Sequence, residues 1–370
     1  MTSLGSSSRE FPPDLSESSG EYSLDESRTS TKSVSWSSEE CQVRILEDYA
    51  STISPLPPIH TMALVAGLML VFFKSLPSLA SLDQVATLGT FTKTNFDSLP
   101  LSAVIAVRLL LATTMLGNAV HVFLYSKWKV DTEYSPNSEL VHVPEIRFRG
   151  ALRTGGTVWS GLKCISSFAL WCWILEGVAF LLAGLIPLYH ELFPGAPISP
   201  WVFRMALVCW ETAAPVSILV SAVAKFALWP MSQSADNIRK RLRTRSALLQ
   251  HNVNTIAALV ELGMLGGLPV CLTHFAFLPL YGILYLLFSY AMMYSWTDRR
   301  HGPQYMYSFF DTTLGATTTV SLVGLLALLL ASLVIFCGVG ALLIEAPESR
   351  GAVPTAAIFL LSLGICRFQD

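Results

Sequence analysis

Charged residues are scarce in this 370-residue sequence. They make up only 14% of it, whereas hydrophobic residues make up 52%. A typical soluble domain has about 25% charged residues. The mean hydropathy of +0.52 is correspondingly high for a chain that must stay dissolved in water. This composition argues against a soluble protein and favours a membrane protein.

Several sequence signals are also absent. The N-terminus lacks the basic start and apolar run of a secretory signal, so we expect a later hydrophobic segment to direct membrane insertion. The seven cysteines form no C-x-x-C pair, which argues against a zinc site or a disulfide framework. No phosphate loop, metal-spaced His/Cys set, haem motif or dinucleotide fingerprint occurs, and we therefore predict neither a cofactor nor a bound metal.

Residues 1–58 differ in composition from the rest of the chain. Runs such as GSSSRE and SVSWSSEE make this segment rich in serine, and its first fifty residues hold ten acidic side chains against four basic ones. It has too few apolar residues to offset the entropy of ordering, so we predict a disordered tail. We expect the tail to be cytosolic and to offer a surface for a cytosolic partner, and residues 59–370 to form a multi-pass transmembrane domain.

Six segments are apolar enough to cross a hydrocarbon core of about 30 Å, which takes about 20 residues of helix. They are 101–125, 166–189, 205–229, 247–265, 274–296 and 316–344. Two weaker stretches, 61–79 and 353–366, are each either a short span or an interfacial helix. We therefore predict an all-α fold: a polytopic transmembrane helix bundle with six core spans, or eight if both weaker stretches cross.

Basic residues are concentrated in two of the connections, at 127–163 and 239–245. Because cytoplasmic loops carry the excess of Lys and Arg, we expect both to face the cytosol. A span at 61–79 would return the N-terminal tail to that side. The run RKRLRTR at 239–245 fits this orienting role, so we predict no nucleic-acid partner. The membrane itself is either an endomembrane or the plasma membrane.

Ionisable residues nevertheless occur inside the predicted spans. A charge at the bilayer centre costs at least about 2.5 kcal/mol, so such residues generally face the bundle interior and indicate a functional site. Here they are Arg108, His121, Glu176, Glu211, His251 and Glu261.

Helical spacing places several of these residues on shared faces. At 100° per residue, Asn254, Thr255, Ala258 and Glu261 all lie within about 80° of His251. In the second span, Ser166, Ala169, Trp173, Glu176 and Phe180 form a similar stripe. The prediction is therefore that His251 faces inward, toward acidic neighbours on adjoining helices.

Two further residues have more than one interpretation. Glu211 lies four positions before Pro215, whose ring is expected to kink the helix and leave room for water or substrate. Glu211 is then either a site residue or a group that bridges helices. Arg108 either holds a carboxylate of a lipid substrate or extends to the membrane interface.

Five segments resemble the rolling stone-like membrane proteins and, more distantly, the androgen-induced transmembrane proteins, some of which hydrolyse fatty acid esters of hydroxy fatty acids. The segments are LKCISSFALWCWILEGVAFLLAGL, CWETAAPVSILVSAVAKFALWP, HNVNTIAALVELGM, LPLYGILYLLFSYAMMYSW and YMYSFFD, within residues 100–315. In the hydrolase branch, the resemblance implies a threonine nucleophile and a histidine base. The base corresponds to His251, whereas the nucleophile position holds Ala169, or Leu170 in a register shifted by one.

These observations leave three functions open. The first is a lipid hydrolase acting on a long-chain ester, with His251 as base, Asn254, Glu261, Glu176 or Glu211 as orienting groups and Ser166 as a displaced nucleophile. The second is a non-enzymatic protein that organises membranes or partners, as the association of the rolling stone name with cell fusion implies, in which the polar cluster only holds helices together. The third is ion-coupled transport, for which no internal repeat is found.

Overall fold

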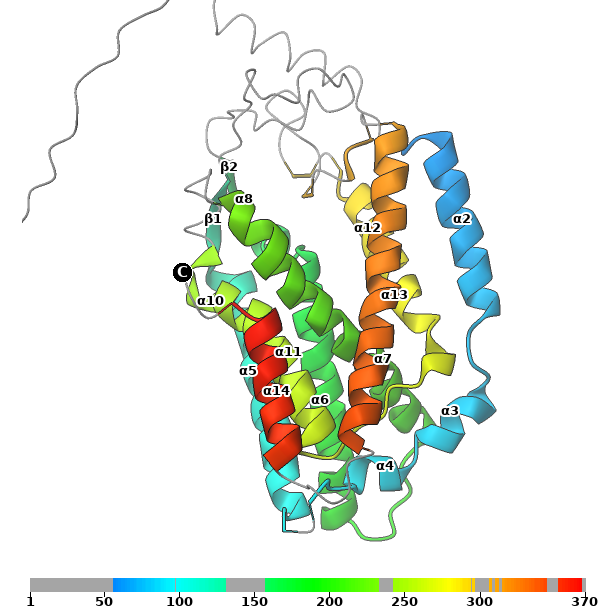
Figure 1. The fold of residues 1–370 in the computed structure, drawn as a ribbon, viewed down its shortest axis with the longest axis vertical. Coiled ribbons are helices and arrows are strands. Elements are labelled where there is room, and N and C mark those ends of the chain that lie inside the picture. The colour runs from blue at the N-terminus through cyan, green and yellow to red at the C-terminus, as the bar shows by residue number, and fades with distance from the viewer. Residues whose placement is uncertain are drawn as a thin grey trace, which may run out of the picture.

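The chain folds into a bundle of long helices, which confirms the predicted all-α class (Figure 1). The computed structural model describes residues 56–96, 98–130, 157–232, 242–293, 295–296, 306–307, 310–312, 315–344 and 352–367. The predicted disordered tail falls almost entirely outside these residues. Its predicted boundary coincides with the start of the first described helix, α2 (Ile59–Lys74).

The remaining elements follow in chain order. The bundle continues with α3 (Leu79–Val85), α4 (Leu88–Thr92), α5 (Leu101–Tyr125), β1 (Lys127–Val130), β2 (Thr157–Ser160), η3 (Gly161–Lys163), α6 (Phe168–Leu192), α7 (Pro200–Val223), η4 (Ala224–Leu228), α8 (Trp229–Ser232), α10 (Arg245–Leu248), η5 (Leu249–Val253), α11 (Asn254–Gly263), η6 (Leu272–His274), α12 (Phe277–Ala291), α13 (Ala316–Ile344) and α14 (Ala352–Ile365). The strands β1 and β2 pair antiparallel, with Lys127 opposite Ser160. Helix α7 runs through Pro215 as one element.

Five helical segments of the described part of the chain are long and apolar enough to cross a membrane. They are 101–125, 168–192, 200–228, 272–291 and 316–342, and they match five of the six predicted spans. This architecture is that of a multi-pass integral membrane protein. A sixth crossing is available if α2 and the α3–α4 segment, which meet at a bend of 65°, form one broken span.

The predicted span at 247–265 differs in character from the other five. This stretch is helical from Arg245 to Gly263 but is not among the segments that are long and apolar enough to cross. Its polar residues Gln250, Asn252, Asn254 and Glu261 are all buried inside the bundle. The helix is therefore packed among other helices, and Gln250, Asn252 and Glu261 have protein hydrogen-bond partners, as does Oδ1 of Asn254. The weaker stretch 353–366 forms α14, a shorter apolar helix of 14 residues.

The two basic connections leave the bundle at the same end. Figure 1 shows the β1–β2 pair, which follows α5, at the end of the bundle that also carries α8, which follows α7. The start of α2 lies at this end too, whereas α3 and α4 lie at the opposite end. Helix α2 thus starts at the end with the basic connections and leads toward α3 and α4 at the opposite end, which is geometrically consistent with the predicted alternation of the loops.

Helices α5 and α6 pack closely because the α6 glycines Gly177 and Gly184 lie against α5 side chains. A Cβ atom built on Gly184 would lie 2.8 Å from Cδ2 of Leu109, so no larger residue fits there without a shift. Close backbone approach is what helix association in lipid requires, since lipid tails are as apolar as leucine and give no hydrophobic driving force. The pair forms one wall of the main core, which is centred on Trp173, Phe180 and Trp210.

A buried ion pair joins α5 to α11. Arg108 donates from Nε to Glu261 Oε2 at 2.9 Å and from Nη2 to Oε1 at 2.6 Å, and both side chains are 0% exposed. The Nη1 group of Arg108 also donates to the carbonyls of Phe91, at 2.7 Å, and Ala183, at 3.1 Å. The guanidinium therefore connects α4, α5, α6 and α11. Arg108 neither binds a substrate nor extends to the interface, and both alternatives of the sequence analysis are wrong.

The loop after α11 is shaped by the same pair. The backbone N–H of Gly266 donates to Glu261 Oε1 at 3.3 Å, and a Cβ atom at Gly266 would clash with Arg108 Nη2. Asn95 closes the junction from the α4 side, because its Nδ2 donates to the Leu262 carbonyl at 3.0 Å. Only glycine leaves enough room for the guanidinium at this point.

We expect Glu261→Met to destabilise the fold strongly. It would leave the Arg108 charge buried without its carboxylate, which typically costs about 3–5 kcal/mol. Thermal unfolding of the detergent-solubilised protein would measure the loss. Adding Arg108→Met to Glu261→Met should recover most of it, because no charge is then stranded.

The surface pair between Asp83 and Arg204 provides the control. Its bonds are as short, at 2.7 Å, but the Asp83 side chain is 45% exposed and water replaces the lost partner. Asp83→Asn should therefore change the midpoint far less than Glu261→Met. Equal effects of the two substitutions would contradict the role given to the buried pair.

Candidate functional site

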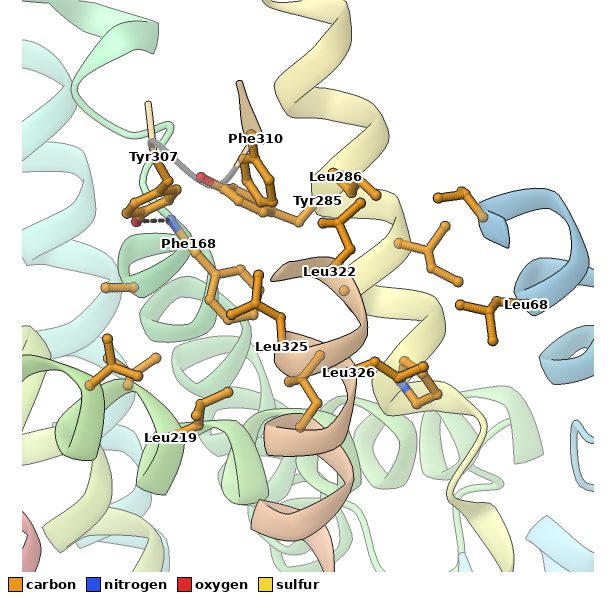
Figure 2. Close-up of a pocket in the computed structure, with 18 of the residues that line it drawn as sticks. Leu68, Phe168, Leu219, Tyr285, Leu286, Tyr307, Phe310, Leu322, Leu325 and Leu326 are labelled. Carbon is orange, nitrogen blue, oxygen red and sulfur yellow. Dashed lines mark hydrogen bonds between the residues drawn. The ribbon is translucent and has the colours of Figure 1, made fainter. Parts of the chain in front are cut away.

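An apolar cavity of about 190 Å³ lies between α2, α6, α7, α12 and α13. Its walls include Leu68 of α2, Leu219 of α7 and the row Leu322, Leu325 and Leu326 of α13 (Figure 2). The full described lining is Leu64, Val65, Leu68, Phe168, Ala169, Leu219, Val220, Val223, Leu228, His251, Pro279, Gly282, Ile283, Tyr285, Leu286, Tyr307, Phe310, Leu322, Leu325, Leu326 and Leu329. No carboxylate belongs to it, which corrects the expectation of acidic neighbours around His251.

Two tyrosines supply the hydroxyl groups of the described lining. Tyr285 donates to the carbonyl of Ser166 at 2.9 Å, and the Tyr307 hydroxyl accepts from the N–H of Phe168 at 3.2 Å. Figure 2 shows both rings beside Phe310 at one end of the cavity. They hold the start of α6 in place, and the sequence analysis did not single them out. Aromatic residues in an apolar segment give no signal that separates such a role from ordinary packing.

His251 reaches the cavity from a π-helical turn. The turn η5, from Leu249 to Val253, widens the helix just before α11, and a second one, η4, ends the α7 helix. Turns of this kind are rare and occur frequently at functional sites. His251 is half-buried and lines the cavity, as predicted for an inward-facing residue. Its neighbour Asn252 instead holds the C-terminal segment, exchanging hydrogen bonds with the Arg367 backbone at 2.8 and 3.0 Å.

Ala169 and Ser166 differ in their relation to the cavity. Ala169, at the position where the resemblance implies a threonine, lines the same cavity as His251. Ser166 is fully buried outside that lining, and its hydroxyl donates to the Leu162 carbonyl at 2.5 Å. The hydroxyl is thus already used to hold the turn before α6, and the helix itself is capped by Ser167, which accepts from the Leu170 N–H at 3.4 Å.

Two of the predicted carboxylates bind other partners. Glu261 pairs with Arg108, and Glu211 accepts from His274 Nδ1 at 2.8 Å and from the Cys271 N–H at 2.9 Å. The prediction failed because residues that share one face of a helix can still lie far apart along its axis. Ten residues separate His251 from Glu261, and at 1.5 Å per residue they lie about 15 Å apart along the helix.

Glu176 is buried in the middle of α6. It is 1% exposed, and neither carboxylate oxygen has a hydrogen-bond partner among the described residues. A polar group buried in this way costs stability, more so when it is charged. Glu176 does not line the cavity and therefore does not orient His251 there.

Asn254 belongs to a polar contact between α7 and α11. Its Oδ1 accepts from Ser221 Oγ at 3.2 Å and from the Thr255 N–H at 2.8 Å. The hydroxyls of Ser221 and Thr255 lie 2.7 Å apart, and Thr255 donates to the Ser217 carbonyl at 2.7 Å. These bonds tie two helices together, so the predicted role of Asn254 as a partner of His251 is replaced by a packing role in this arrangement.

The structure assembles one group of side chains that the sequence did not reveal. Glu211, Cys271 and His274 each offer a donor atom, and the three atoms lie within 4.8 Å of one another. Burial raises the pKa of the Cys271 thiol to about 12, with the nearby Glu211 adding to the effect. The sequence shows only the C-x-x-H spacing of CLTH at this point. Two potential ligands are too few to indicate a metal site, and the third, Glu211, lies 60 positions before Cys271.

The chain was compared with known proteins at the level of families, sequences and structures. No protein-family model, no curated protein and no solved structure matches it.

We expect Glu176→Met to stabilise the protein. An apolar side chain of similar length removes a buried carboxylate that has no described partner, which corresponds to about 1–3 kcal/mol. Thermal unfolding in detergent would measure the rise in midpoint. The control is Glu261→Met, which removes an equally buried carboxylate and should lower the midpoint in the same assay. A fall for Glu176→Met would show that its carboxylate has a stabilising partner.

Proposed function

We propose that this protein is a multi-pass membrane protein that binds an acyl-chain lipid in the cavity beside His251. The proposal rests on one observation: the five segments that resemble the rolling stone-like proteins all reach this cavity. Each contributes at least one residue to this cavity: Phe168 and Ala169, Leu219 and Val220, His251, Pro279 and Tyr285, and Tyr307 and Phe310. Segments far apart in the sequence thus form one apolar chamber.

The chemistry of the walls selects the class of ligand. Every described side chain of the lining except His251 and the two tyrosines is apolar, so a charged or sugar-like ligand would lose its hydration without replacement. An acyl chain fits such walls. It gains little by leaving the bilayer, however, because the lipid tails are equally apolar. Selectivity must therefore come from the shape of the cavity and from its few polar groups.

His251 is the polar group best suited to meet the head of the ligand. Its imidazole can donate to a carbonyl or carboxyl oxygen and can accept from a hydroxyl. The tyrosine hydroxyls are already bonded to the backbone at the start of α6. A fatty acid or ester whose polar end lies at His251 would then extend its chain along the leucines of α13.

The composition of the cavity lining does not favour a covalent acyl-enzyme intermediate. The described lining contains no serine or threonine, and the position implied for the nucleophile is the methyl group of Ala169. Ester hydrolysis remains the second candidate, favoured by one observation: Ala169 and His251, the two positions that the resemblance pairs, line the same cavity. In this chain it would require water activated by His251.

The N-terminal tail is proposed to face the cytosol. Helix α2 starts at the end of the bundle from which both basic connections leave, and excess positive charge is typical of cytoplasmic loops. The membrane lipid is in this view both the solvent and the source of the ligand. Partner organisation by the tail and ion-coupled transport remain predictions from the sequence.

Ligand binding can be tested with a photoactivatable fatty acid in lipid nanodiscs. Leu325→Trp fills the cavity from α13 and should reduce labelling several-fold, with labelled peptides of the wild type mapping to α6, α12 and α13. Leu328→Trp is the matched control, because that leucine lies on the same helix and is 49% exposed. Equal labelling of the two variants would contradict binding in this cavity.

The nucleophile argument can be tested by restoring the hydroxyl. Wild-type protein should not react with a long-chain fluorophosphonate, whereas Ala169→Thr should gain a covalent adduct at residue 169 because His251 is then available as a base. Intact mass measurement would detect it. Adding His251→Ala should abolish the adduct. Adduct formation on a serine or threonine of the wild type would show instead that a hydrolase nucleophile is present.

A further inference from the structure

Three metal-ligand side chains meet at the end of the bundle that also holds α3. Glu211 comes from α7, Cys271 precedes the turn η6, and His274 ends it. Glu211 and His274 are buried, at 4% and 3% exposure, and Cys271 is partly exposed. None of the three lines the apolar cavity, so this group is a separate site.

We propose that Glu211, Cys271 and His274 bind a divalent transition-metal ion of the zinc class. The ion would be held by one carboxylate oxygen, one thiolate sulfur and Nδ1 of the imidazole. These oxygen, sulfur and nitrogen donors are the three kinds that zinc accepts in proteins. Three protein ligands leave one position of a tetrahedron for a water molecule.

The local backbone explains why the donors converge. In a 3₁₀ turn, side chains three residues apart eclipse one another. The turn η6 therefore brings Cys271 and His274 to the same side, facing α7. There Glu211 accepts from the Cys271 N–H, which fixes the start of the turn against the carboxylate.

The distances are close to those of a metal site. With bonds of about 2.0–2.3 Å, donors in a tetrahedral zinc site lie about 3.5 Å apart. The separation between His274 Nδ1 and the nearer Glu211 oxygen is 2.8 Å, and all three donors lie within 4.8 Å of one another. An ion between them needs the His–Glu pair to open by less than 1 Å and the sulfur to approach.

The protons balance in a simple way. The Cys271 thiol gives its proton to solvent as the sulfur–metal bond forms. The proton that His274 Nδ1 now shares with Glu211 moves to Nε2, because Nδ1 must offer its lone pair to the metal. Nε2 lies 3.3 Å from Ser81 Oγ on α3, and a hydroxyl can accept as well as donate. Ser81 is therefore a positioning residue that suits the metal-bound tautomer.

Cobalt provides the most direct probe of this site. The full-length protein in detergent would be stripped with a chelator and titrated with CoCl2, and then with ZnCl2 in competition. We expect a sulfur-to-cobalt charge-transfer band in the near ultraviolet and the visible bands of tetrahedral cobalt, saturating at one ion per chain. Zinc should abolish both. Absence of the sulfur band in the wild type would overturn the proposal.

Substitutions then assign the ligands. Cys271→Ser should remove the sulfur band, and His274→Gln should weaken binding further than Ser81→Ala, whose loss should be about tenfold. Cys164→Ser is the control, since that thiol is bonded to the Trp159 carbonyl beside the β1–β2 pair. Cys271 is partly exposed, so its variant should elute as a monodisperse species. A Cys271→Ser protein that folds and keeps the sulfur band would refute the site.

Discussion

The buried pair of Arg108 and Glu261 is the interaction on which the arrangement of the bundle depends. One guanidinium bonds a carboxylate of α11 and backbone carbonyls from α4 and α6, and both charged groups are completely shielded from solvent. Unpaired, each would cost several kilocalories per mole in such surroundings, so the helices must meet in the register that brings all four partners together. A lipid environment strengthens this constraint, because apolar side chains alone give little preference for one helix arrangement over another.

This register has a direct consequence for the candidate sites. With α11 fixed at its Glu261 end, the π-helical turn at its other end carries His251 into the space between α7, α12 and α13. The same α7 helix presents Glu211 at one level and the cavity wall Leu219 at another, eight residues further on. A polar metal-ligand group and an apolar chamber can therefore coexist in one small bundle, about 12 Å apart along the helix.

Much of the fold could be predicted from the sequence, but the pairing of its polar residues could not. Five spans were located to within a few residues, since their length and apolar character are local properties. The segment at 247–265 is helical as predicted, but its buried polar residues set it apart from the five continuously apolar spans. For the site, the inward-facing His251 was predicted correctly from periodicity. The partners assigned to it were wrong, because periodicity gives the angle around a helix and says nothing about the level of a neighbour.

The sequence by itself determined the class of molecule, the number and place of most long helices and the face that His251 presents. These follow from composition and from the 3.6-residue period, which act along the chain. Only the tertiary structure decided that Arg108 binds Glu261, that Glu211 lies beside Cys271 and His274, and that Ala169 shares a cavity with His251. Glu211 and Cys271 are 60 positions apart along the chain, and Arg108 and Glu261 are 153 positions apart. The distances between these side chains depend on the angles at which the helices cross and on their relative positions along the bundle axis. No single segment encodes either.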